Sequence, residues 1–313
     1  MPRPGARRWS LALSLPLLLA TACRRVRDAA PPARDASRDV ISSARHPSTS
    51  VPLRAPPDSQ IPDGALGASI RRGHALLAAT RDSLPGHVGN RLRCLSCHLD
   101  DGRRPYASPL VGVYARYPQY SARSATVNLI EDRINDCFRR SMNGTPLAPD
   151  SRDLHDITAY LAWLSRGIPV GATVEGQGLM TLKPLRPDTI QGRMLYAATC
   201  VRCHGTHGEG TVVAPPLWGP ESFNIGAGMA RLRTAAAFIR HNMPYDRPGS
   251  LTDQQAFDIA GYVTSRPRPD LAGKENDWPN GDAPPDVAYP TRGAHTPSRS
   301  DARTLTRTHA QPR

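Results

Sequence analysis

The sequence feature that most limits how this chain can fold is a short pattern, Cys-x-x-Cys-His, that occurs twice in 313 residues. It spans Cys94–His98 and Cys200–His204. Two thiols at this spacing can add to the vinyl groups of a haem, and the histidine that follows can bind the iron. A redox Cys-x-x-Cys pair or half of a zinc site is the alternative, but neither explains a histidine directly after both motifs. The pattern predicts two haem c groups, with His98 and His204 as proximal ligands and with thioether bonds at Cys94, Cys97, Cys200 and Cys203.

Each motif stands inside a repeated helical arrangement. Helical stretches precede the motifs at 70–80 and 190–199, and amphipathic helices follow at 153–164 and 253–263. Apolar residues recur at helical spacing in both following segments, and Ser151 and Thr252 are placed to cap them. Both segments share the pattern Asp-Ile-x-(Ala/Gly)-Tyr-(Leu/Val). Since no strand pattern stands out, the sequence predicts an all-α fold of two tandem cytochrome c-like domains, each with one covalently bound haem.

The composition changes on either side of these helical repeats. Residues 24–60 are rich in Pro, Arg, Ser and Ala, and residues 266–313 are rich in Pro and polar residues. Such segments bury too little apolar surface to fold alone, so we predict a disordered tether and a disordered tail. A Pro- and Gly-rich linker at 171–187 then separates a first domain at 61–170 from a second at 188–265.

The first 23 residues have the pattern of an export signal. Arg3, Arg7 and Arg8 precede an apolar run, Leu11–Leu19, that is too short to span a bilayer. Small residues before Cys23 indicate a lipoprotein processing site, with ordinary cleavage nearby as the alternative. The mature protein is therefore expected to be periplasmic, and a lipid on Cys23 would anchor it to the membrane.

The net charge does not call for a nucleic-acid partner. Lys plus Arg number 40 against 27 Asp plus Glu, a difference of +13. Within 61–264 the counts are 22 and 17, so the difference there is only +5. We expect no nucleic acid as partner, since arginines in such a small excess can pair with haem propionates.

The distal ligand of the second haem is expected in the loop before the last helix. Met243 stands there directly before Pro244. A thioether ligand raises the reduction potential of a haem. His241 and Met229 are the competing ligands, and a packed core methionine is the non-ligand alternative.

Two residues compete for the corresponding position at the first haem. Met142 lies 18 residues before Tyr160, much as Met243 lies 19 residues before Tyr262, so spacing favours Met142. Cys137 lies five residues earlier and belongs to neither haem motif nor the signal. A free thiol in the periplasm is a liability unless it is buried or used, and a thiolate ligand would lower the potential. The residues alone leave both alternatives open.

The stretch from Ile130 to Gly144 resembles a segment of the dihaem thiosulfate dehydrogenases. The resemblance rests on Ile-Glu-Asp-Arg-Ile-Asn-Asp-Cys-Phe-Arg-Arg-Ser-Met-Asn-Gly together with the two haem motifs and Asn242-Met243-Pro244. It also includes the segments 215–219 and 226–229, and it covers about residues 61–264. The first module is also similar to the cytochrome A subunit of the Sox system.

This resemblance implies an activity and a set of roles. Members of the family join two thiosulfates into tetrathionate and pass two electrons to an external cytochrome, and some run the reaction backwards. The first haem would be the active site, with Cys137 as distal ligand and catalytic sulfur. Arg123 and Arg133 match substrate-binding arginines, and Ser141 matches a nearby polar contact. The second haem would pass electrons on, with Met243 as its distal ligand.

Arginine suits this chemistry because two thiosulfate dianions must meet. Two unit charges about 4 Å apart repel by about 4 kcal/mol at an effective dielectric near 20, and two dianions by roughly four times that. Guanidinium groups bind oxyanions bidentately and keep their charge. The alternative for Arg123 and Arg133 is pairing with haem propionates or with Asp132 and Asp136. We interpret Cys137 as a transient sulfur partner that leaves the iron, binds one thiosulfate covalently and is displaced by the second.

Other functions fit parts of the sequence. A non-catalytic dihaem electron carrier needs both haems but not Cys137. A dihaem peroxidase needs one open iron site, and sulfur transfer onto a cysteine of a carrier protein needs a partner. The Cys137 segment favours the dehydrogenase over the carrier and the peroxidase.

Overall fold

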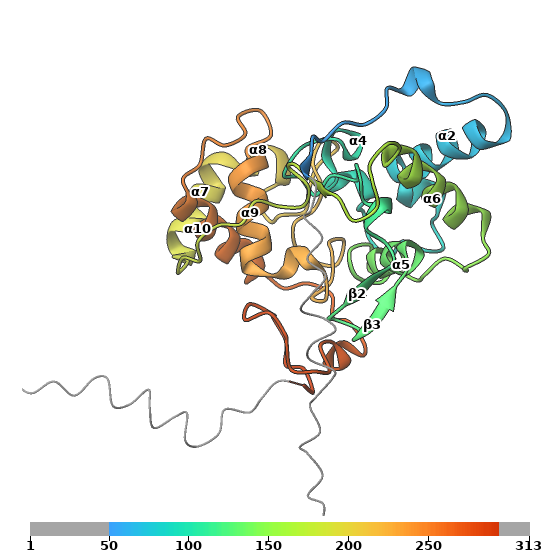
Figure 1. Ribbon diagram of the computed structural model, residues 1–313. Coiled ribbons are helices and arrows are strands. Elements are labelled where there is room, and N and C mark those ends of the chain that lie inside the picture. The colour runs from blue at the N-terminus through green and yellow to red at the C-terminus, as the bar shows by residue number, and fades with distance from the viewer. Residues whose placement is uncertain (1–49, 294–313) are drawn as a thin grey trace, which may run out of the picture. The chain divides into compact units, whose positions relative to one another are not determined.

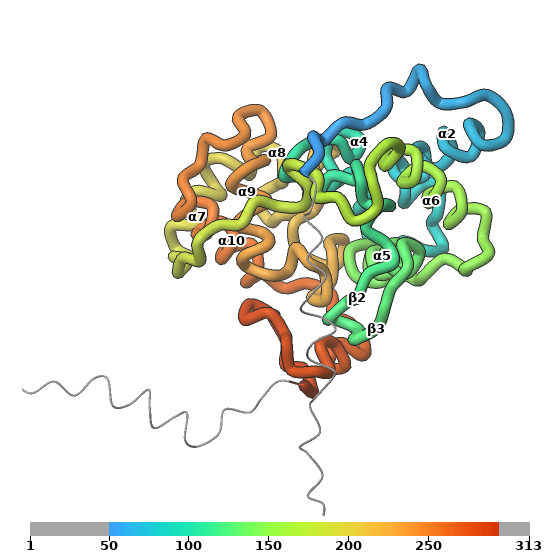
Figure 2. The backbone as a smooth tube through the Cα atoms, viewed as in Figure 1, coloured from blue at the N-terminus to red at the C-terminus, as the bar shows by residue number. Residues whose placement is uncertain are grey.

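The computed structural model describes residues 50–293, and Figures 1 and 2 show the course of the chain. The expected export signal at 1–23, with Cys23, lies outside the described residues. Within 50–293, no helix combines the length and the apolar character needed to cross a membrane. Helices are the main regular structure of the described chain, as predicted, and its strands are two or three residues long.

The first module is built from helices around the first haem motif. These are α2 (Gly64–Ala78), α3 (Thr80–Ser83), α4 (Leu99–Gly102), α5 (Ile130–Arg140) and α6 (Arg152–Leu164), with 3-10 turns η1 (Asp58–Gln60), η2 (Cys94–Ser96) and η3 (Tyr114–Arg116). Helices α2 and α6 pack against each other, and α5 contacts α6 (Figure 1). The predicted N-cap of α6 is confirmed, because the Ser151 side chain accepts a hydrogen bond from the backbone N–H of Leu154. The apolar core of this module includes Ile70, Leu77, Phe138, Leu154, Tyr160 and Leu164.

The second module repeats this arrangement. Its helices are α7 (Thr189–Thr199), α8 (Val201–His204), α9 (Leu232–Asn242) and α10 (Asp253–Thr264), with the 3-10 turn η4 (Gly228–Ala230). Helix α10 packs against both α7 and α9. Thr252 caps α10 as predicted, accepting from the N–H of Gln255, whose side chain in turn accepts from the N–H of Thr252.

The same glycine contact joins the first and last helices of both modules. Gly73 of α2 lies against the backbone of Asp156, and Gly192 of α7 lies against the backbone of Asp258. In each case an added Cβ would overlap the aspartate carbonyl group. A side chain at either glycine would therefore separate two helices whose apolar faces are in contact.

We expect Gly192→Ala to destabilise the second module by about 3 kcal/mol, because the new methyl group has to push α7 and α10 apart. Gly86→Ala is the matched control, since a Cβ at Gly86 has nothing within 4 Å and should change stability by less than about 0.5 kcal/mol. Chemical denaturation of the two holoproteins measures the difference. Equal midpoints and slopes for both variants would contradict this account of the helix crossing.

Two small sheets are additions to the predicted fold. Strand β1 (Ser50–Val51) pairs in parallel with β4 (Thr173–Val174), and β2 (Gln119–Ser121) pairs antiparallel with β3 (Thr126–Asn128). Their shortness explains why no strand pattern was visible in the sequence. The second pair forms a hairpin that leads directly into α5 (Figure 1).

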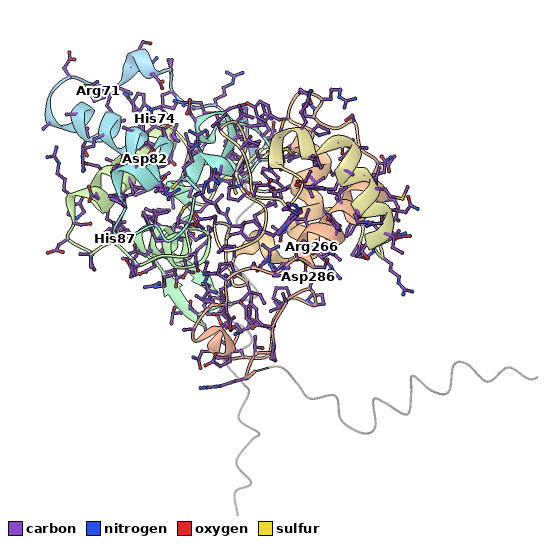
Figure 3. All side chains as sticks on the ribbon, turned by 180° about the vertical axis from the view of Figure 1, so that it is seen from behind. Arg71, His74, Asp82, His87, Arg266 and Asp286 are labelled. Atoms are coloured by element: carbon purple, nitrogen blue, oxygen red, sulfur yellow. The ribbon has the colours of Figure 1, made fainter. Side chains whose placement is uncertain are left out.

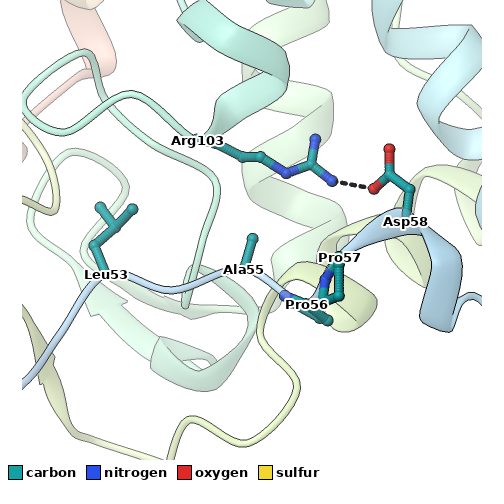
Figure 4. A pocket seen from close by; sticks show the side chains of 6 residues that line it. All are labelled: Leu53, Ala55, Pro56, Pro57, Asp58 and Arg103. Carbon is teal, nitrogen blue, oxygen red and sulfur yellow. Dashed lines mark hydrogen bonds and ion pairs between the residues drawn. The ribbon is translucent and has the colours of Figure 1, made fainter.

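The prediction of a disordered tether is wrong for residues 50–60. The β1–β4 pairing holds the start of this segment, and an ion pair between Asp58 and Arg103 at 2.5 Å holds its end. A surface pocket of about 500 Å³ lies between them, lined by Leu53, Ala55, Pro56, Pro57, Asp58 and Arg103 (Figure 4). Composition alone missed this order because the contacts join residues far apart in the sequence.

The prediction of a disordered tail is wrong for residues 266–293. Trp278 and Tyr289 in this segment are 4 % and 8 % exposed, and Asp277 is buried. The segment includes the 3-10 turn η5 (Lys274–Asn276) and, coloured orange-red in Figure 1, runs beside β2 and β3. It is ordered by tertiary contacts of a few aromatic and charged side chains, which its Pro-rich composition does not reveal.

Candidate active site

The first haem motif is held by a buried hydroxyl group. Thr80 is fully buried at the start of α3, and its Oγ1 accepts a hydrogen bond from the N–H of Cys94 at 3.0 Å. The same hydroxyl lies 3.4 Å from the Cys94 sulfur. Burial raises the pKa of the Cys94 and Cys97 thiols to about 12, and the negative charge of Cys137 adds to the effect. Cys137 therefore lies close to both thiols of this motif.

Both motif histidines are oriented by the same kind of hydrogen bond. His98 Nδ1 lies 2.5 Å from the carbonyl oxygen of Ser108, and His204 Nδ1 lies 2.8 Å from that of Pro215. A carbonyl can only accept, so Nδ1 carries the proton and Nε2 keeps its lone pair for a metal. Neither carbonyl group was predicted from the sequence, although a Pro-Leu-x-Gly pattern follows each of them.

These residues fit two covalently attached haems. Each motif offers two thiols and an imidazole whose Nε2 is free to ligate iron. Within residues 50–293, no group of three or more His, Cys, Asp or Glu is arranged to hold a metal ion.

Cys137 lies on α5, one helical turn after Arg133, and faces the first motif. Arg133 Nη1 donates a hydrogen bond to the Cys137 sulfur at 2.8 Å. Burial raises the pKa of this thiol, but the positive charge of Arg133, the neighbouring His98 and the hydrogen bond from Arg133 outweigh it and lower the pKa to about 7. The thiolate in turn raises the pKa of Arg133. The structure thus places a polarised sulfur beside His98 of the first haem motif.

Met142, the competitor on spacing, occupies a different environment. It is 4 % exposed and belongs to the apolar core of the first module, with Phe138 and Leu147. Helix α5 ends at Arg140, and the N–H of Met142 bonds back to the carbonyl of Cys137 at 2.9 Å. Met142 therefore packs as an ordinary core side chain, whereas Cys137 meets polar partners.

Ser141 and Arg123 are placed differently from Arg133. Ser141 is the C-cap of α5, and its N–H bonds to the carbonyl of Cys137 at 2.8 Å. Arg123 lies in the turn between β2 and β3 and donates to the carbonyl of Gly226 at 3.0 Å. Burial, and then the charge of Arg140, lower the pKa of Arg123 to about 10, which leaves it charged at neutral pH. Within residues 50–293, Arg133 therefore donates to the Cys137 sulfur, whereas Arg123 donates to Gly226 and not to Cys137.

The proposed ligand loop of the second module touches the first module. Met243 packs against an apolar cluster of Leu99, Ala107 and Phe238, and Leu99 directly follows His98. The Asn242 side chain donates to the carbonyl of Tyr106 at 3.0 Å. Met243 is therefore near both modules.

The two competing ligands of the second haem lie near Met243. Met229 packs against the same apolar cluster. The His241 ring packs against the Tyr106 ring at a tilted angle, with centroids 5.7 Å apart. Its buried Nε2 has no hydrogen-bond partner within residues 50–293. Met243 as distal ligand stays a prediction.

Comparison with known proteins identifies the family. A family model described as the SoxA/TsdA cytochrome c domain matches residues 88–170, and one described as cytochrome C oxidase, cbb3-type, subunit III matches residues 187–263. The chain is 47 % identical over 242 residues to a thiosulfate dehydrogenase of Psychrobacter arcticus, covering 75 % of this chain and 74 % of that one. It is 49 % identical over 241 residues to a thiosulfate dehydrogenase of Allochromatium vinosum, covering 74 % and 89 %.

A solved structure agrees with these relatives. Thiosulfate dehydrogenase (TsdBA) from Marichromatium purpuratum is similar with a TM-score of 0.69 and 37 % identity, over 75 % of this chain. The chain spans about half of that solved chain, 54 % of its length. The predicted all-α fold with two cytochrome c domains is confirmed. The resemblance stated from the Cys137 segment is confirmed as well, and the chain belongs to the thiosulfate dehydrogenase family.

Proposed function

We propose that this protein is a dihaem cytochrome c that oxidises two thiosulfates to tetrathionate. The observation that carries the proposal is the Cys137 sulfur, held by Arg133 beside the His98 motif. An electron carrier has no need of a nucleophilic sulfur at this point. The family membership of the chain supports the same reaction.

The reaction balances through a covalent bond to Cys137. The Cys137 thiolate and the sulfane sulfur of one thiosulfate form a sulfur–sulfur bond, which releases two electrons and leaves Cys137–S–S–SO₃⁻. The sulfane sulfur of a second thiosulfate then attacks the outer sulfur of that bond. Tetrathionate forms, and the Cys137 thiolate leaves with the electron pair of the broken bond. The cysteine is regenerated, so no sulfur stays on the protein.

Arg133 is placed to assist both steps. Its guanidinium already lies 2.8 Å from the sulfur at which the bond forms and breaks. It stabilises the thiolate as attacking group and again as leaving group, because its charge is permanent. It also offsets part of the repulsion between the thiolate and the incoming dianions, which at an effective dielectric near 20 is several kcal/mol per close charge pair, roughly.

The two haems, when bound, would accept the two electrons one at a time. His98 and Cys137 would hold the iron of the first, and His204 and Met243 that of the second. Met243 packs against the apolar cluster that includes Leu99, the residue after His98, which supports a short path between the two sites. We propose that electrons leave through the second module to an external cytochrome.

The proposal extends to direction and location. Each bond made in the forward reaction can be broken in reverse, so the protein would also reduce tetrathionate when its acceptor is reduced. The export pattern at 1–23 supports a periplasmic location, with membrane anchoring through a lipid on Cys23.

An assay of the purified holoprotein tests the function directly. We expect thiosulfate to reduce the haems, and with ferricyanide as acceptor we expect two ferricyanides reduced for each tetrathionate formed. Tetrathionate added to the dithionite-free, reduced protein should reoxidise the haems. Haem spectra that stay unchanged on adding thiosulfate would instead favour a non-catalytic electron carrier.

A further inference from the structure

The C-terminal arm, which we define as residues 270–293, is docked onto both modules. Asp277 forms a bidentate ion pair with Arg140 of α5, at 2.7 and 2.8 Å. At the other end of the arm, the N–H of Arg233 in α9 bonds to Asp286 at 2.8 Å, and Asp286 is labelled in the reverse view of Figure 3. These contacts at Asp277 and Asp286 bind the arm to both modules. The ion pair at Asp277 fixes its position relative to α5, the helix that carries Cys137.

Within this arm, Trp278 holds Arg123 at two points. The guanidinium carbon of Arg123 lies over the Trp278 ring, 4.7 Å from its centroid. The backbone N–H of Trp278 donates to the carbonyl of Arg123 at 2.8 Å. The guanidinium also donates to Gly226 of the second module, which makes a third contact. The arginine is thereby held by two separate segments of the chain, the arm at Trp278 and the loop at Gly226.

The backbone of Trp278 is itself unusual. Its φ is +52°, in the left-handed region that bulky side chains rarely adopt. Such a conformation persists only where surrounding contacts hold it, and it recurs at functional sites. Here the contacts are the hydrogen bond to Arg123, the bond from Gly281 to the Trp278 carbonyl at 3.0 Å, and packing against the Tyr289 ring at 6.4 Å.

The carbonyl of Gly226 accepts from Arg123 at a point where two segments approach so closely that only glycine fits. A Cβ on Gly226 would overlap Leu271 of the arm and would lie 2.9 Å from Nη1 of Arg140. The close approach of arm and loop keeps the Gly226 carbonyl within reach of both arginines, at 3.0 Å for Arg123 and 3.5 Å for Arg140.

The surroundings of Arg123 favour an anion. The charges of Arg140 and Arg231 act on it unfavourably, and Asp277 is the carboxylate that opposes them. Asp277 is already engaged by Arg140 and by the hydroxyl of Tyr289 at 2.6 Å. A partly desolvated guanidinium that lies near two other arginines gains more from an oxyanion than one in open water.

We infer that Trp278 is a positioning residue for thiosulfate binding, which it supports by holding Arg123 in the geometry that receives the dianion. The inference rests on the proposed function and extends it to the arm. Ordering Arg123 before substrate arrives removes a cost that binding would otherwise have to meet. The arm therefore acts on affinity for thiosulfate rather than on the sulfur chemistry at Cys137.

The decisive variant is Trp278→Leu, which fills apolar space without an aromatic face. In the ferricyanide assay with holoprotein, we expect KM for thiosulfate to rise by about tenfold while kcat stays within about twofold. Trp278→Phe keeps a ring and should restore a KM near that of the wild type. Trp278→Gly, which tolerates the left-handed backbone, replaces the Leu variant if that one does not accumulate.

A double-mutant cycle separates positioning from a structural role. Trp278→Leu should raise KM no further in a protein that already carries Arg123→Ala, since the ring would act through that arginine. The haem absorbance spectrum and the haem content should match the wild type in each variant. An equal further rise in the Arg123→Ala background, or a fall in kcat with unchanged KM, would overturn the inference.

Thiosulfate oxidation by the wild-type protein tests the proposed function separately from the role of Trp278. Wild-type protein that does not oxidise thiosulfate overturns both. Wild-type protein that does, together with an unchanged KM in Trp278→Leu, overturns the positioning role alone.

Discussion

Replacing Cys137 by serine is expected to lower turnover of thiosulfate by about a thousandfold or more while both haems stay attached. A serine hydroxyl cannot form the sulfur–sulfur bond that the proposed reaction needs. The haem attachment residues, Cys94 and Cys97 with His98, are unchanged, so the protein should still fold around its cofactor. Initial rates with ferricyanide and the haem content of the purified variant measure the two effects.

Cys137→Met distinguishes a sulfur that binds iron from a sulfur that reacts. A thioether can ligate haem iron, but it cannot form the covalent adduct with thiosulfate. We expect this variant to be as inactive as Cys137→Ser. Full activity in the methionine variant would restrict Cys137 to the role of a ligand. Mass spectrometry of wild-type protein treated with thiosulfate under oxidising conditions should find one added thiosulfate on the peptide that carries Cys137.

Arg133→Ala is expected to lower kcat/KM for thiosulfate by about 10²-fold or more, because one preorganised donor at the reacting atom is removed. The Nη1 donor lies 2.8 Å from the Cys137 sulfur, and its charge is the main factor that favours the thiolate. Steady-state rates across a range of thiosulfate concentrations give the change. The effect should appear in kcat as well as KM, unlike that of Trp278→Leu.

Two further variants serve as controls for Arg133. Arg133→Lys keeps a positive charge but lacks the planar fork, so it should recover only part of the lost activity. Arg81→Ala removes an exposed arginine of the same module, on α3, and should leave kcat/KM within about twofold of the wild type. A comparable loss in Arg81→Ala would show that general charge, and not the contact with Cys137, explains the result.

The sequence alone predicted the order of the helices, and it indicates the residues that would attach the haems. Cys-x-x-Cys-His is a local pattern whose chemistry depends on spacing along the chain. The capping residues Ser151 and Thr252 were also predicted correctly, because an N-cap bonds to a residue only three positions away. Interactions of this range are encoded within a few residues.

Local sequence patterns did not decide whether Cys137 or Met142 is the distal ligand of the first haem. Spacing from the last helix of each module favoured Met142, whereas the resemblance favoured Cys137. In the fold, α5 ends between the two residues, so Met142 turns into the core and Cys137 stays toward His98. The end of α5 between the two residues gives them different surroundings, and Cys137 as distal ligand stays a prediction.

The two Cys-x-x-Cys-His motifs therefore predicted two cytochrome c modules from the sequence alone. The tertiary structure distinguished their surroundings, because it placed Arg133 and Cys137 beside the first motif and packed the Met243 loop against residues of the first module. It also ordered the arm at 270–293, whose composition indicated disorder, through Asp277 and Trp278 meeting arginines more than a hundred residues earlier. The physical reason is one of range: covalent attachment and capping act locally, whereas ion pairs, stacking and burial depend on which distant segments the fold places together.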